Sequence, residues 1–345
     1  MEFHLLDSSQ VDWDKLDGFE DRLVFQTREW MEFLAETQKA TPVIAALHNG
    51  STTVGYFSGL IFRRAGIRIL GSPFPGWTTA YLGFNLPSHI RRGEALQALE
   101  TFAFRDLKCL HLEVSDRYMP QEEGESLGFS YDLCRTLFND LMQSEEEIFR
   151  SMTGPCRGCI RKAEKSGLRI EETRDEDFAD DYYEQLKDVF GKQGLVPTYG
   201  LDRVKQLIRH MLPTGKLLLL RARDPQKKCI ATGIYLALNE VEAFYWGNAS
   251  FRHSQHYRPN ELLNWYAMRY WKQRGFQVFD WGGADYCRRF KAKFGAQPSS
   301  YPRFRKSRFA FLGILRQQAE GLFSLKRRFA GMFHPSSDNA HRFDL

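Results

Sequence analysis

The residues that suggest chemistry most directly lie near the end of the chain, in the segment FKAKFG at positions 290–295. A lysine ammonium held between aromatic side chains can stabilise the negative charge that develops on a carbonyl oxygen during acyl transfer. Lys291 is therefore a candidate catalytic residue, and Phe290 is one of the rings that would anchor it. Asp280 precedes Trp281 and two glycines at the predicted end of a strand, where a carboxylate and a bare backbone suit a closely approaching ligand. A turn in which Asp280 serves only as a cap is the alternative.

A second group of residues has the composition of an anion site. The segment HSQHYRPN at 253–260 lies between a predicted strand and a predicted helix, and Pro259 and Asn260 both favour the start of a helix. The free N–H groups of a helix start attract phosphates and carboxylates, and Arg258 adds a positive charge. The segment therefore predicts anion binding, with an ordinary helix cap as the alternative. Its two histidines have no further metal ligand close by, so no metal site is predicted.

Arg157 and Arg161 lie about one helical turn apart, on a basic face that also includes Lys162. A guanidinium group can bind two phosphate oxygens at once. This face is therefore either a phosphate contact or an ordinary solvated surface. Cys156 and Cys159 lie in the same segment, but a zinc site needs two more ligands and a redox pair needs a strand before the helix. We interpret the two cysteines as structural.

The loop GSPFPGW at 71–77 precedes a predicted strand and combines glycine, proline and aromatic residues. Loops often carry binding sites, and the Trp77 ring has the shape to stack on a sugar or a nucleobase. A rigid surface turn is the alternative.

Two stretches of the chain repeat the same order of elements. The first has predicted strands at 41–48, 53–63 and 67–70, then a helix at 90–104 and a strand at 109–114. The second has predicted strands at 216–221, 229–238 and 240–247, then a helix at 260–274 and a strand at 276–281. A helical connector at 143–165, with a capping box at Ser144 and a break at Gly154, separates them. The periodicity of the apolar residues therefore predicts an α/β (α+β) protein with two similar units, each a mixed, mostly antiparallel sheet flanked by helices.

Composition limits the class of protein. Apolar residues make up 43% and charged residues 26% of the 345 residues, which is typical of a folded chain long enough for two domains. The net charge of +5 is uneven, because residues 301–345 carry a net charge of +6 and the first 300 residues a net charge of −1. A basic surplus at one end argues against a nucleic-acid-binding surface over the whole body. The sequence also lacks the usual motifs of serine hydrolases, P-loop kinases, dinucleotide-binding proteins and zinc proteases.

No stretch reaches the ~20 apolar residues of a transmembrane helix, and the first residues lack the pattern of a signal peptide. Six cysteines in a chain of this length do not form a disulfide framework, so a cytoplasmic protein is expected. Residues 309–345 form a basic tail, in which apolar side chains recur every three or four positions as far as 333. Docking on the body, contact with an anionic membrane surface and contact with tRNA remain open for this tail.

Taken in order, these segments resemble the tandem-GNAT transferases, which include the FemABX peptidoglycan-bridge aminoacyltransferases and related N-acyltransferases of polysaccharide and cell-envelope gene clusters. The resemblance is carried by residues 157–167, 231–236, 245–250, 258–268, 279–283 and 290–295, with 26–30 as a similar opening segment. The segments are spread over most of the range 20–305, and their order is more specific than any single piece. The resemblance implies two GNAT-like domains, at 1–143 and at 144–308 with the connector at 144–166, followed by the tail at 309–345.

The resemblance also implies roles for individual residues. Lys291 matches the lysine that stabilises the tetrahedral oxyanion, and Arg258 takes the place of the pyrophosphate-binding loop, without that loop's usual glycines. Tyr245 and Asp280 would border the donor site, where either is a candidate to accept a proton from the attacking amine or to orient it. The further binding residues would be Arg157, Arg161, Asn260, Trp246, Phe290 and Trp77.

The expected function is that of an N-acyltransferase, which moves an acyl group from an acyl-CoA-type thioester to an amine on a sugar, an amino acid or a cell-envelope precursor. A Fem-type peptidyltransferase that uses aminoacyl-tRNA is the first alternative, and a non-catalytic tandem-GNAT binding protein is the second. Acyl-CoA or aminoacyl-tRNA would be a co-substrate, with no permanently bound cofactor and no metal. The reaction would take place in the cytoplasm, or at the inner face of the membrane if the tail binds there.

Overall fold

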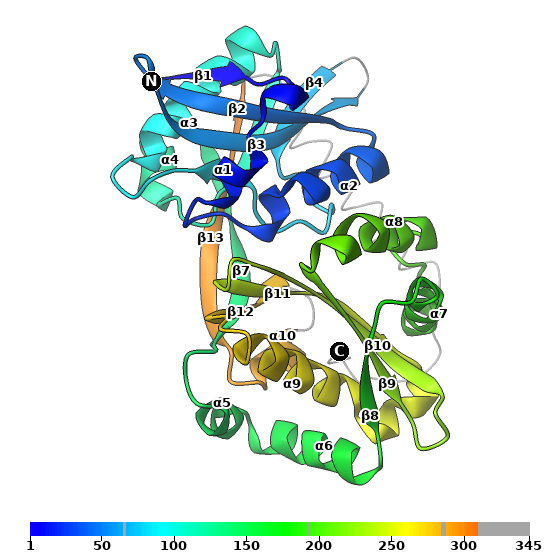
Figure 1. The fold of residues 1–345 in the computed structure, drawn as a ribbon. Coiled ribbons are helices and arrows are strands. Elements are labelled where there is room, and N and C mark those ends of the chain that lie inside the picture. The colour runs from blue at the N-terminus through cyan, green and yellow to red at the C-terminus, as the bar shows by residue number, and fades with distance from the viewer. Residues whose placement is uncertain (65–66, 192–193, 284–287, 310–345) are drawn as a thin grey trace.

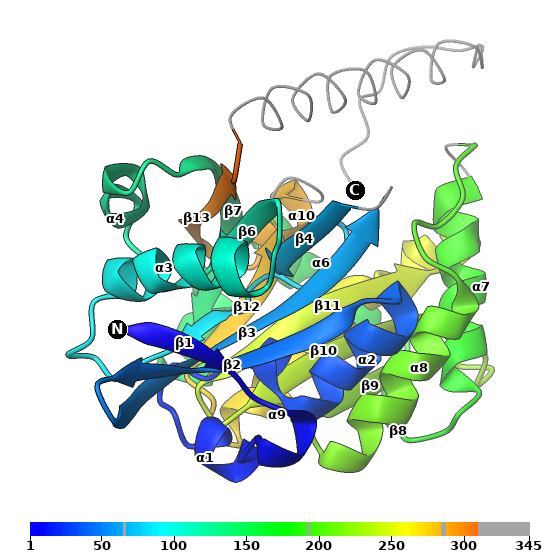
Figure 2. The ribbon, with the colours of Figure 1, turned by 90° about the horizontal axis from the view of Figure 1, so that it is seen from above.

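The computed structural model describes residues 1–64, 67–191, 194–283 and 288–309. One large mixed sheet runs through the molecule, with strands in the order β1-β2-β3-β4-β6-β13-β7-β12-β11-β10-β9-β8 and with β5 paired to β3. Helices cover both faces of this sheet (Figures 1 and 2). The predicted α/β class with a mixed, mostly antiparallel sheet is confirmed. No helix among the described residues is long and apolar enough to cross a membrane.

The first half, which we use as a name for residues 1–143, begins on a short edge strand and ends on a long strand in the middle of the sheet. Its elements are β1 (Glu2–Leu5), α1 (Trp13–Asp17), α2 (Arg28–Gln38), β2 (Thr41–Asn49), β3 (Thr52–Arg64), β4 (Ile67–Ser72), β5 (Gly83–Asn85), α3 (Arg92–Thr101), β6 (His111–Ser115), α4 (Gln121–Ser126) and β7 (Ser130–Asp140). The predicted strands and helix lie within a few residues of β2, β3, β4, α3 and β6. No prediction covered β1, β5 or β7.

The second half, residues 144–308, repeats this order after two connecting helices. Its elements are α5 (Glu145–Ser151), α6 (Gly154–Lys165), β8 (Arg169–Thr173), α7 (Phe178–Gly191), α8 (Leu201–Met211), β9 (Leu217–Arg223), β10 (Cys229–Leu238), β11 (Glu242–Ser250), α9 (Pro259–Lys272), β12 (Val278–Gly283), α10 (Arg288–Ala292) and β13 (Gln297–Ser307). Ser144 caps α5 in the predicted capping box. The helix is interrupted at Met152 and Thr153, just before the predicted position, and Gly154 is the first residue of α6. No prediction covered β8 or β13.

The two halves exchange their last strands. The last strand of the first half, β7, pairs with β12 of the second half, and the last strand of the second half, β13, pairs with β6 of the first. The two exchanged strands also pair with each other, from Gln297 opposite Phe138 to Arg305 opposite Ser130, and run side by side from the upper to the lower body in Figure 1. Strands of both halves therefore form one continuous sheet. The domain limits at 143 and 308 stay predictions.

Three apolar clusters hold the layers together. One lies mainly in the first half and includes Leu99 of α3, and a second lies mainly in the second half and includes Trp265 of α9. The exchanged strands β13 and β7 each contribute a side chain to the cluster of the other half. The third is shared, since Trp30 of α2 and Leu207 of α8 belong to the same buried cluster. Helices α2 and α8 lie side by side in both ribbon views (Figures 1 and 2). Burial of apolar surface therefore joins the two halves as well as filling each of them.

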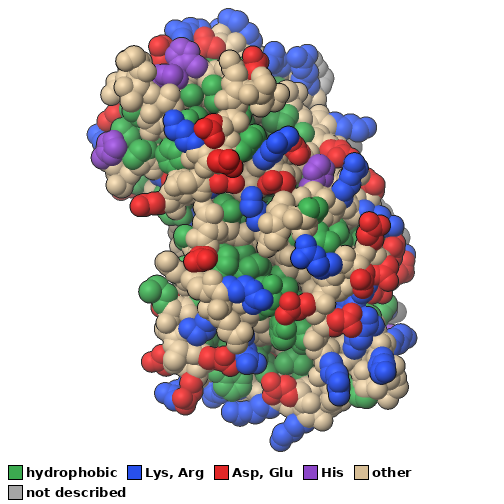
Figure 3. Space-filling model, in the orientation of Figure 1, with side chains coloured by type: hydrophobic (Ala, Val, Ile, Leu, Met, Phe, Trp, Pro, Cys, Tyr) green, Lys and Arg blue, Asp and Glu red, His purple; other side chains and the backbone are tan. Residues whose placement is uncertain are grey.

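The structure corrects the predicted distribution of charge. Arg303, Arg305 and Lys306 belong to the basic surplus that we assigned to the end of the chain, but they lie on β13 in the middle of the sheet. Arg305 pairs with Asp132 at 2.8 Å, and Lys306 pairs with Glu100 at 2.8 Å. Part of the surplus is thus neutralised within the body, on which charges of both signs are interspersed in the view of Figure 3. Of the tail predicted at 309–345, all but residue 309 lies outside the described residues.

The exchanged strand β13 predicts a test of the fold. A Cβ at Gly124 of α4 would lie 2.1 Å from a ring carbon of the fully buried Phe304 on β13. We expect Gly124→Ala to lower the free energy of unfolding by about 1–3 kcal/mol, because neither α4 nor the strand can move without loss of packing. Gly158→Ala on α6 is the matched control, since its Cβ would meet no atom within 4 Å. It should raise stability by about 0.5–1 kcal/mol. Urea unfolding measures both, and a Gly124→Ala protein as stable as the wild type would contradict the packing argument.

Candidate active site

An opening lies between β11 and β12, the parallel pair in the second half. The two strands pair only over Glu242–Phe244 and Val278–Asp280, after which β11 continues beside β10 and β12 continues beside β7. In addition β11 has a bulge, because Gly247 lies opposite Ile234 and Tyr245 opposite Tyr235, which leaves Trp246 without a partner in the register. Bulges bend a strand and re-aim its groups, and they are frequent next to active sites. We call this opening the donor wedge.

A cavity of about 280 Å³ lies at the donor wedge. Its walls come from β11, from the start of α9 and from the α10 region, and they include Tyr245, Asn248, Arg258, Asn260, Phe290 and Lys293. The structure thus brings together four of the predicted site residues, Tyr245, Arg258, Asn260 and Phe290. Asn248 and Lys293 belong to motifs that we singled out, although neither residue was proposed for the site.

The start of α9 faces this cavity with the features predicted for an anion site. Arg258 has a left-handed backbone (φ 62°) and precedes Pro259, the first residue of the helix, and no side chain of the described residues caps the free N–H groups there. The side-chain oxygens of Asn248 and Asn260 are buried and have no hydrogen-bond partner in the part of the chain that the structure describes. Buried polar atoms are normally satisfied, so these oxygens are suited to accept hydrogen bonds from a ligand or water.

Lys291 does not itself line the cavity, but it lies next to Tyr245, which does. The Lys291 side chain is buried, and its Nζ donates hydrogen bonds to the carbonyl oxygens of Trp281 at 2.7 Å and of Gly283 at 2.8 Å. The same Nζ lies 5.0 Å from the centre of the Tyr245 ring. Two carbonyl groups at the end of β12 therefore hold the ammonium against the tyrosine that lines the cavity, where its charge can act on a developing oxyanion.

Asp280 does not lie with Tyr245 and Lys291, which corrects our expectation that it borders the donor site. Side chains alternate along a strand, so Phe279 and Trp281 pack in the apolar cluster of the second half while Asp280 points to the other face of the sheet. There the carboxylate is fully buried, and it accepts three hydrogen bonds, from Thr136 Oγ1 at 2.6 Å, Gly282 N at 2.7 Å and Tyr81 Oη at 2.8 Å. Both oxygens of the Asp280 carboxylate are thus hydrogen-bonded within the protein, and Asp280 does not line the cavity.

The predicted linker residues lie away from the cavity as well. Arg157 donates hydrogen bonds to the carbonyl oxygens of Arg150 and Met152, and the Arg161 guanidinium lies 5.4 Å from the ring of Phe149. Neither arginine lines the wall. Their contacts agree with the alternative interpretation, in which α6 presents an ordinary helix face.

Trp246 and Trp77 lie on the face of the shared cluster. The Trp246 ring is 5.3 Å from that of Tyr199, and Arg203 of α8 donates hydrogen bonds to the Trp77 carbonyl and to Thr78 Oγ1. The loop of the first half is thereby tied to α8 of the second. Burial lowers the pKa of Arg203 to about 10. Nothing in the sequence distinguished Arg203 from the other charged residues of its helix.

The corresponding parallel pair of the first half, β4 and β6, has no such opening. Leu82 N donates to the Ser115 carbonyl at 3.2 Å and Phe84 N to Asp116 Oδ2 at 2.9 Å, so the chain itself covers the end of β6. At the start of α3, Gly93 N donates to Glu123, and Arg92 pairs with Asp116 and Asp21. Carboxylates of the protein thus occupy the anion-attracting end of this helix. Of the two helices that follow the parallel strand pairs, α3 is served by carboxylates at its start, and α9 has no side-chain cap among the described residues.

The Asp280 carboxylate predicts a pH dependence of stability. Burial raises its pKa above the ordinary value, and the attraction of Arg117 and the three hydrogen bonds oppose this shift only in part. The folded protein therefore binds the proton more tightly than the unfolded chain does, and the contribution of Asp280 to stability falls as pH rises from about 4 towards the raised pKa.

We expect the free energy of unfolding of the wild type, minus that of Asp280→Asn, to decrease between about pH 4 and pH 7. Asn keeps the acceptor for Thr136 and Gly282 and removes the ionisation. Urea titrations at a series of pH values measure the difference, with Asp14→Asn on the exposed side of α1 as the control. A difference that is constant or increases with pH would contradict the assignment.

Comparison with known proteins agrees with this geometry. Residues 150–292, which contain the donor wedge, match the family model described as an Acetyltransferase (GNAT) domain. No match was found among curated protein sequences. No group of three or more His, Cys, Asp or Glu with the geometry of a metal site occurs in the described ranges.

Three solved structures show how far the fold is shared. FemX is 13% identical, with a TM-score of 0.69 over 88% of this chain and 97% of its own. A tandem GNAT protein from the clavulanic acid biosynthesis pathway is 12% identical, with a TM-score of 0.50 over 89% of this chain and 98% of its own. The C-terminal domain of a putative lysylphosphatidylglycerol synthetase from Agrobacterium fabrum is 12% identical, with a TM-score of 0.53 over 80% and 87%. The protein is therefore an acyltransferase with a GNAT domain, in a chain whose overall fold is similar to that of FemX.

Proposed function

We propose that the protein is an N-acyltransferase that binds an acyl-CoA-type thioester in the donor wedge and transfers the acyl group to an amine. The observation that carries the proposal is that the start of α9 shares a cavity with Tyr245, and that the fixed Lys291 ammonium lies next to this tyrosine. Arg258 and the free N–H groups of α9 would bind the donor's diphosphate, since a helix start favours anions. The side-chain oxygens of Asn248 and Asn260 would accept hydrogen bonds from the amide groups of its pantetheine chain.

The proposed reaction is a direct displacement. The amine lone pair attacks the thioester carbonyl carbon, a C–N bond forms, and the carbonyl oxygen becomes an oxyanion near Lys291. Collapse of this intermediate breaks the C–S bond and releases the thiolate, which takes up the proton that the amine loses. Tyr245, the hydroxyl-bearing side chain on the wall beside Lys291, is our candidate to relay that proton.

Asp280 would act by positioning rather than by touching substrate. It accepts a hydrogen bond from Gly282 N, and the carbonyls on either side of that residue, of Trp281 and Gly283, hold Lys291. Tyr81 from the first half donates to the same carboxylate. The first half would therefore support the geometry of the ammonium without supplying a reacting group.

The second candidate donor is aminoacyl-tRNA, favoured by the similarity of the whole fold to FemX. The chemistry would then differ only in the leaving group, because an ester C–O bond breaks and a ribose hydroxyl is released. The acceptor would be an amine on a sugar, an amino acid or a cell-envelope precursor, and the site of action the cytoplasm or the inner face of the membrane.

A donor assay separates the two candidates. Purified protein is incubated with radiolabelled acetyl-CoA or with a mixture of radiolabelled aminoacyl-tRNAs, each with a panel of amino sugars, amino acids and envelope precursors. We expect amide formation from the thioester, insensitive to RNase and with a single donor bound per chain. Transfer that requires charged tRNA and stops after RNase treatment would replace the first candidate by the second, and no transfer from either donor would contradict the proposed function.

The proposed role of Lys291 predicts a large effect on turnover. We expect Lys291→Ala to lower kcat by about 10²–10³-fold, since a charge that stabilises an oxyanion is lost. Lys165→Ala, at the exposed end of α6, is the matched control and should leave kcat unchanged. Thermal unfolding must accompany the kinetics, because Lys291 also holds two carbonyl groups. A variant that is destabilised but turns over normally would leave Lys291 with a structural role only.

A further inference from the structure

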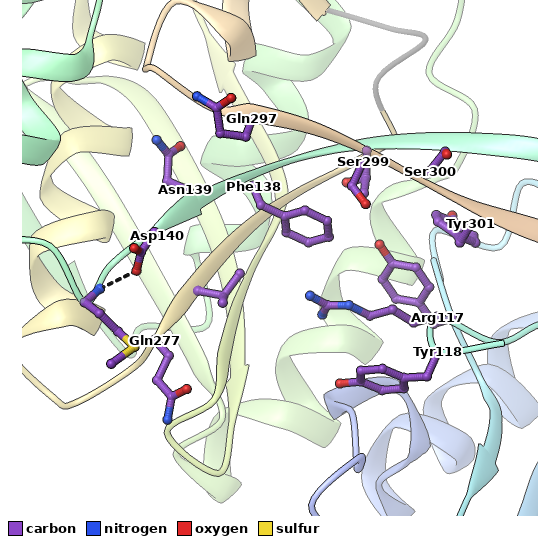
Figure 4. Close-up of a pocket in the computed structure, with 14 residues that line it drawn as sticks. Arg117, Tyr118, Phe138, Asn139, Asp140, Gln277, Gln297, Ser299, Ser300 and Tyr301 are labelled. Atoms are coloured by element: carbon purple, nitrogen blue, oxygen red, sulfur yellow. Dashed lines mark hydrogen bonds between the residues drawn. The ribbon is translucent and has the colours of Figure 1, made fainter. Parts of the chain in front are cut away.

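A second and larger cavity, of about 460 Å³, lies where the two halves meet (Figure 4). Its walls come from β7, β12 and β13 and from Arg117 and Tyr118, which follow β6. It lies on the face of the sheet that carries Asp280, and it shares no lining residue with the cavity at the donor wedge. The volume falls within the range of ~300–1,000 Å³ that is usual for small-molecule sites.

The charged groups at this cavity already have partners within the protein. The Arg117 guanidinium forms an ion pair with Glu242, which is buried at the start of β11. The Asp140 carboxylate accepts hydrogen bonds from Met142 N at 2.8 Å and from Gln143 Nε2 at 3.3 Å. An anionic ligand would have to compete with Glu242, and a cationic ligand would have to compete with the partners of Asp140. The cavity is therefore suited to a ligand without net charge.

Aromatic and neutral polar side chains line the rest of the cavity. Figure 4 shows Arg117 and Tyr118 on one side and Phe138 across from them, and the guanidinium carbon of Arg117 lies 4.6 Å from the centre of the Phe138 ring. Amide and hydroxyl groups surround these rings, from Gln277, Gln297, Ser299 and Ser300. Such groups donate and accept hydrogen bonds without carrying charge.

We propose that this cavity is a binding site for a neutral saccharide. A sugar ring presents an apolar C–H face that packs on aromatic rings such as Tyr118, and a rim of hydroxyls that pairs with amide and hydroxyl side chains such as those of Gln277 and Ser299. No purely apolar ligand would satisfy the amide groups, and an ion would have to compete with the partners that Arg117 and Asp140 already have. The proposal is independent of the proposed acyl donor, because the two cavities use different residues on different faces of the sheet.

The test is a binding titration of the full-length protein. Maltose, cellobiose and N-acetylglucosamine are the neutral probes, and glucose 6-phosphate and glucosamine are the charged controls, each followed by saturation-transfer NMR and calorimetry. We expect at least one neutral sugar to bind and the charged analogues to bind more weakly. Tyr118→Ala and Gln277→Ala, both at exposed positions, should each weaken the binding by about 3–10-fold, since each removes a contact and leaves the fold intact.

Gln97→Ala on the exposed side of α3 is the matched control and should leave the affinity unchanged. Failure of all three neutral sugars to bind up to their solubility limits would overturn the proposal. So would binding that Tyr118→Ala and Gln277→Ala leave unchanged, or a preference for the charged analogues. None of these results depends on acyl transfer, so the outcome stands whether or not the proposed donor is correct.

Discussion

The pairing of β7 with β13 is the interaction on which the rest of the structure depends. Each of these strands is the last of its half, and each leaves that half to complete the sheet of the other. An exposed strand edge is a liability, and the exchange removes two such edges from the middle of the molecule. It also places Thr136 of β7 against Asp280 of β12. The same exchange forms the walls of the larger cavity, which would not exist if each half completed its own sheet.

A second constraint is the difference between the two helix starts. Both halves have a parallel strand pair followed by a helix, and both helix starts have N–H groups that require acceptors. In the first half Glu123 accepts a hydrogen bond from the start of α3, and Asp116, which follows β6, accepts one from Phe84 N. Among the described residues of the second half no side chain caps α9, and the side-chain oxygens of Asn248 and Asn260 have no hydrogen-bond partner. A duplicated fold therefore has one half closed by its own carboxylates and one half open to a ligand.

Buried hydrogen bonds around Asp280 connect the junction between the two halves with the position of Lys291. The Asp280 carboxylate accepts hydrogen bonds from Tyr81 and Thr136 of the first half and from Gly282 of the second, so both halves hold it in place. A buried carboxylate is costly unless every oxygen is bonded, which means that these partners have to stay in place together. The turn after Asp280 in turn supplies the carbonyl groups that hold Lys291. Stability of the junction and geometry of the ammonium thus rest on the same hydrogen bonds.

Local pattern was enough to predict much of the fold. The apolar periodicity of β2, β3 and β10, the capping box at Ser144 and the start of α9 at Pro259 depend on neighbours in the sequence, and the structure agrees with all of them. The order of the motifs was enough to reveal the resemblance to the tandem-GNAT transferases. Four of the residues that this resemblance suggested line one cavity, namely Tyr245, Arg258, Asn260 and Phe290.

What the sequence could not determine was decided by contacts between distant segments. The long strand β13 carries Pro298, Pro302 and several charges, so only its pairing with β6 and β7 makes it a strand in the middle of a sheet. The resemblance to the tandem-GNAT transferases placed Asp280 and Tyr245 at one site, yet alternation along β12 directs the carboxylate to the opposite face of the sheet. Tyr81 and Arg203 had no local signal, because their partners lie more than a hundred residues away. Local chemistry therefore identified which residues are suited to a site, and only the tertiary structure decided which of them share one.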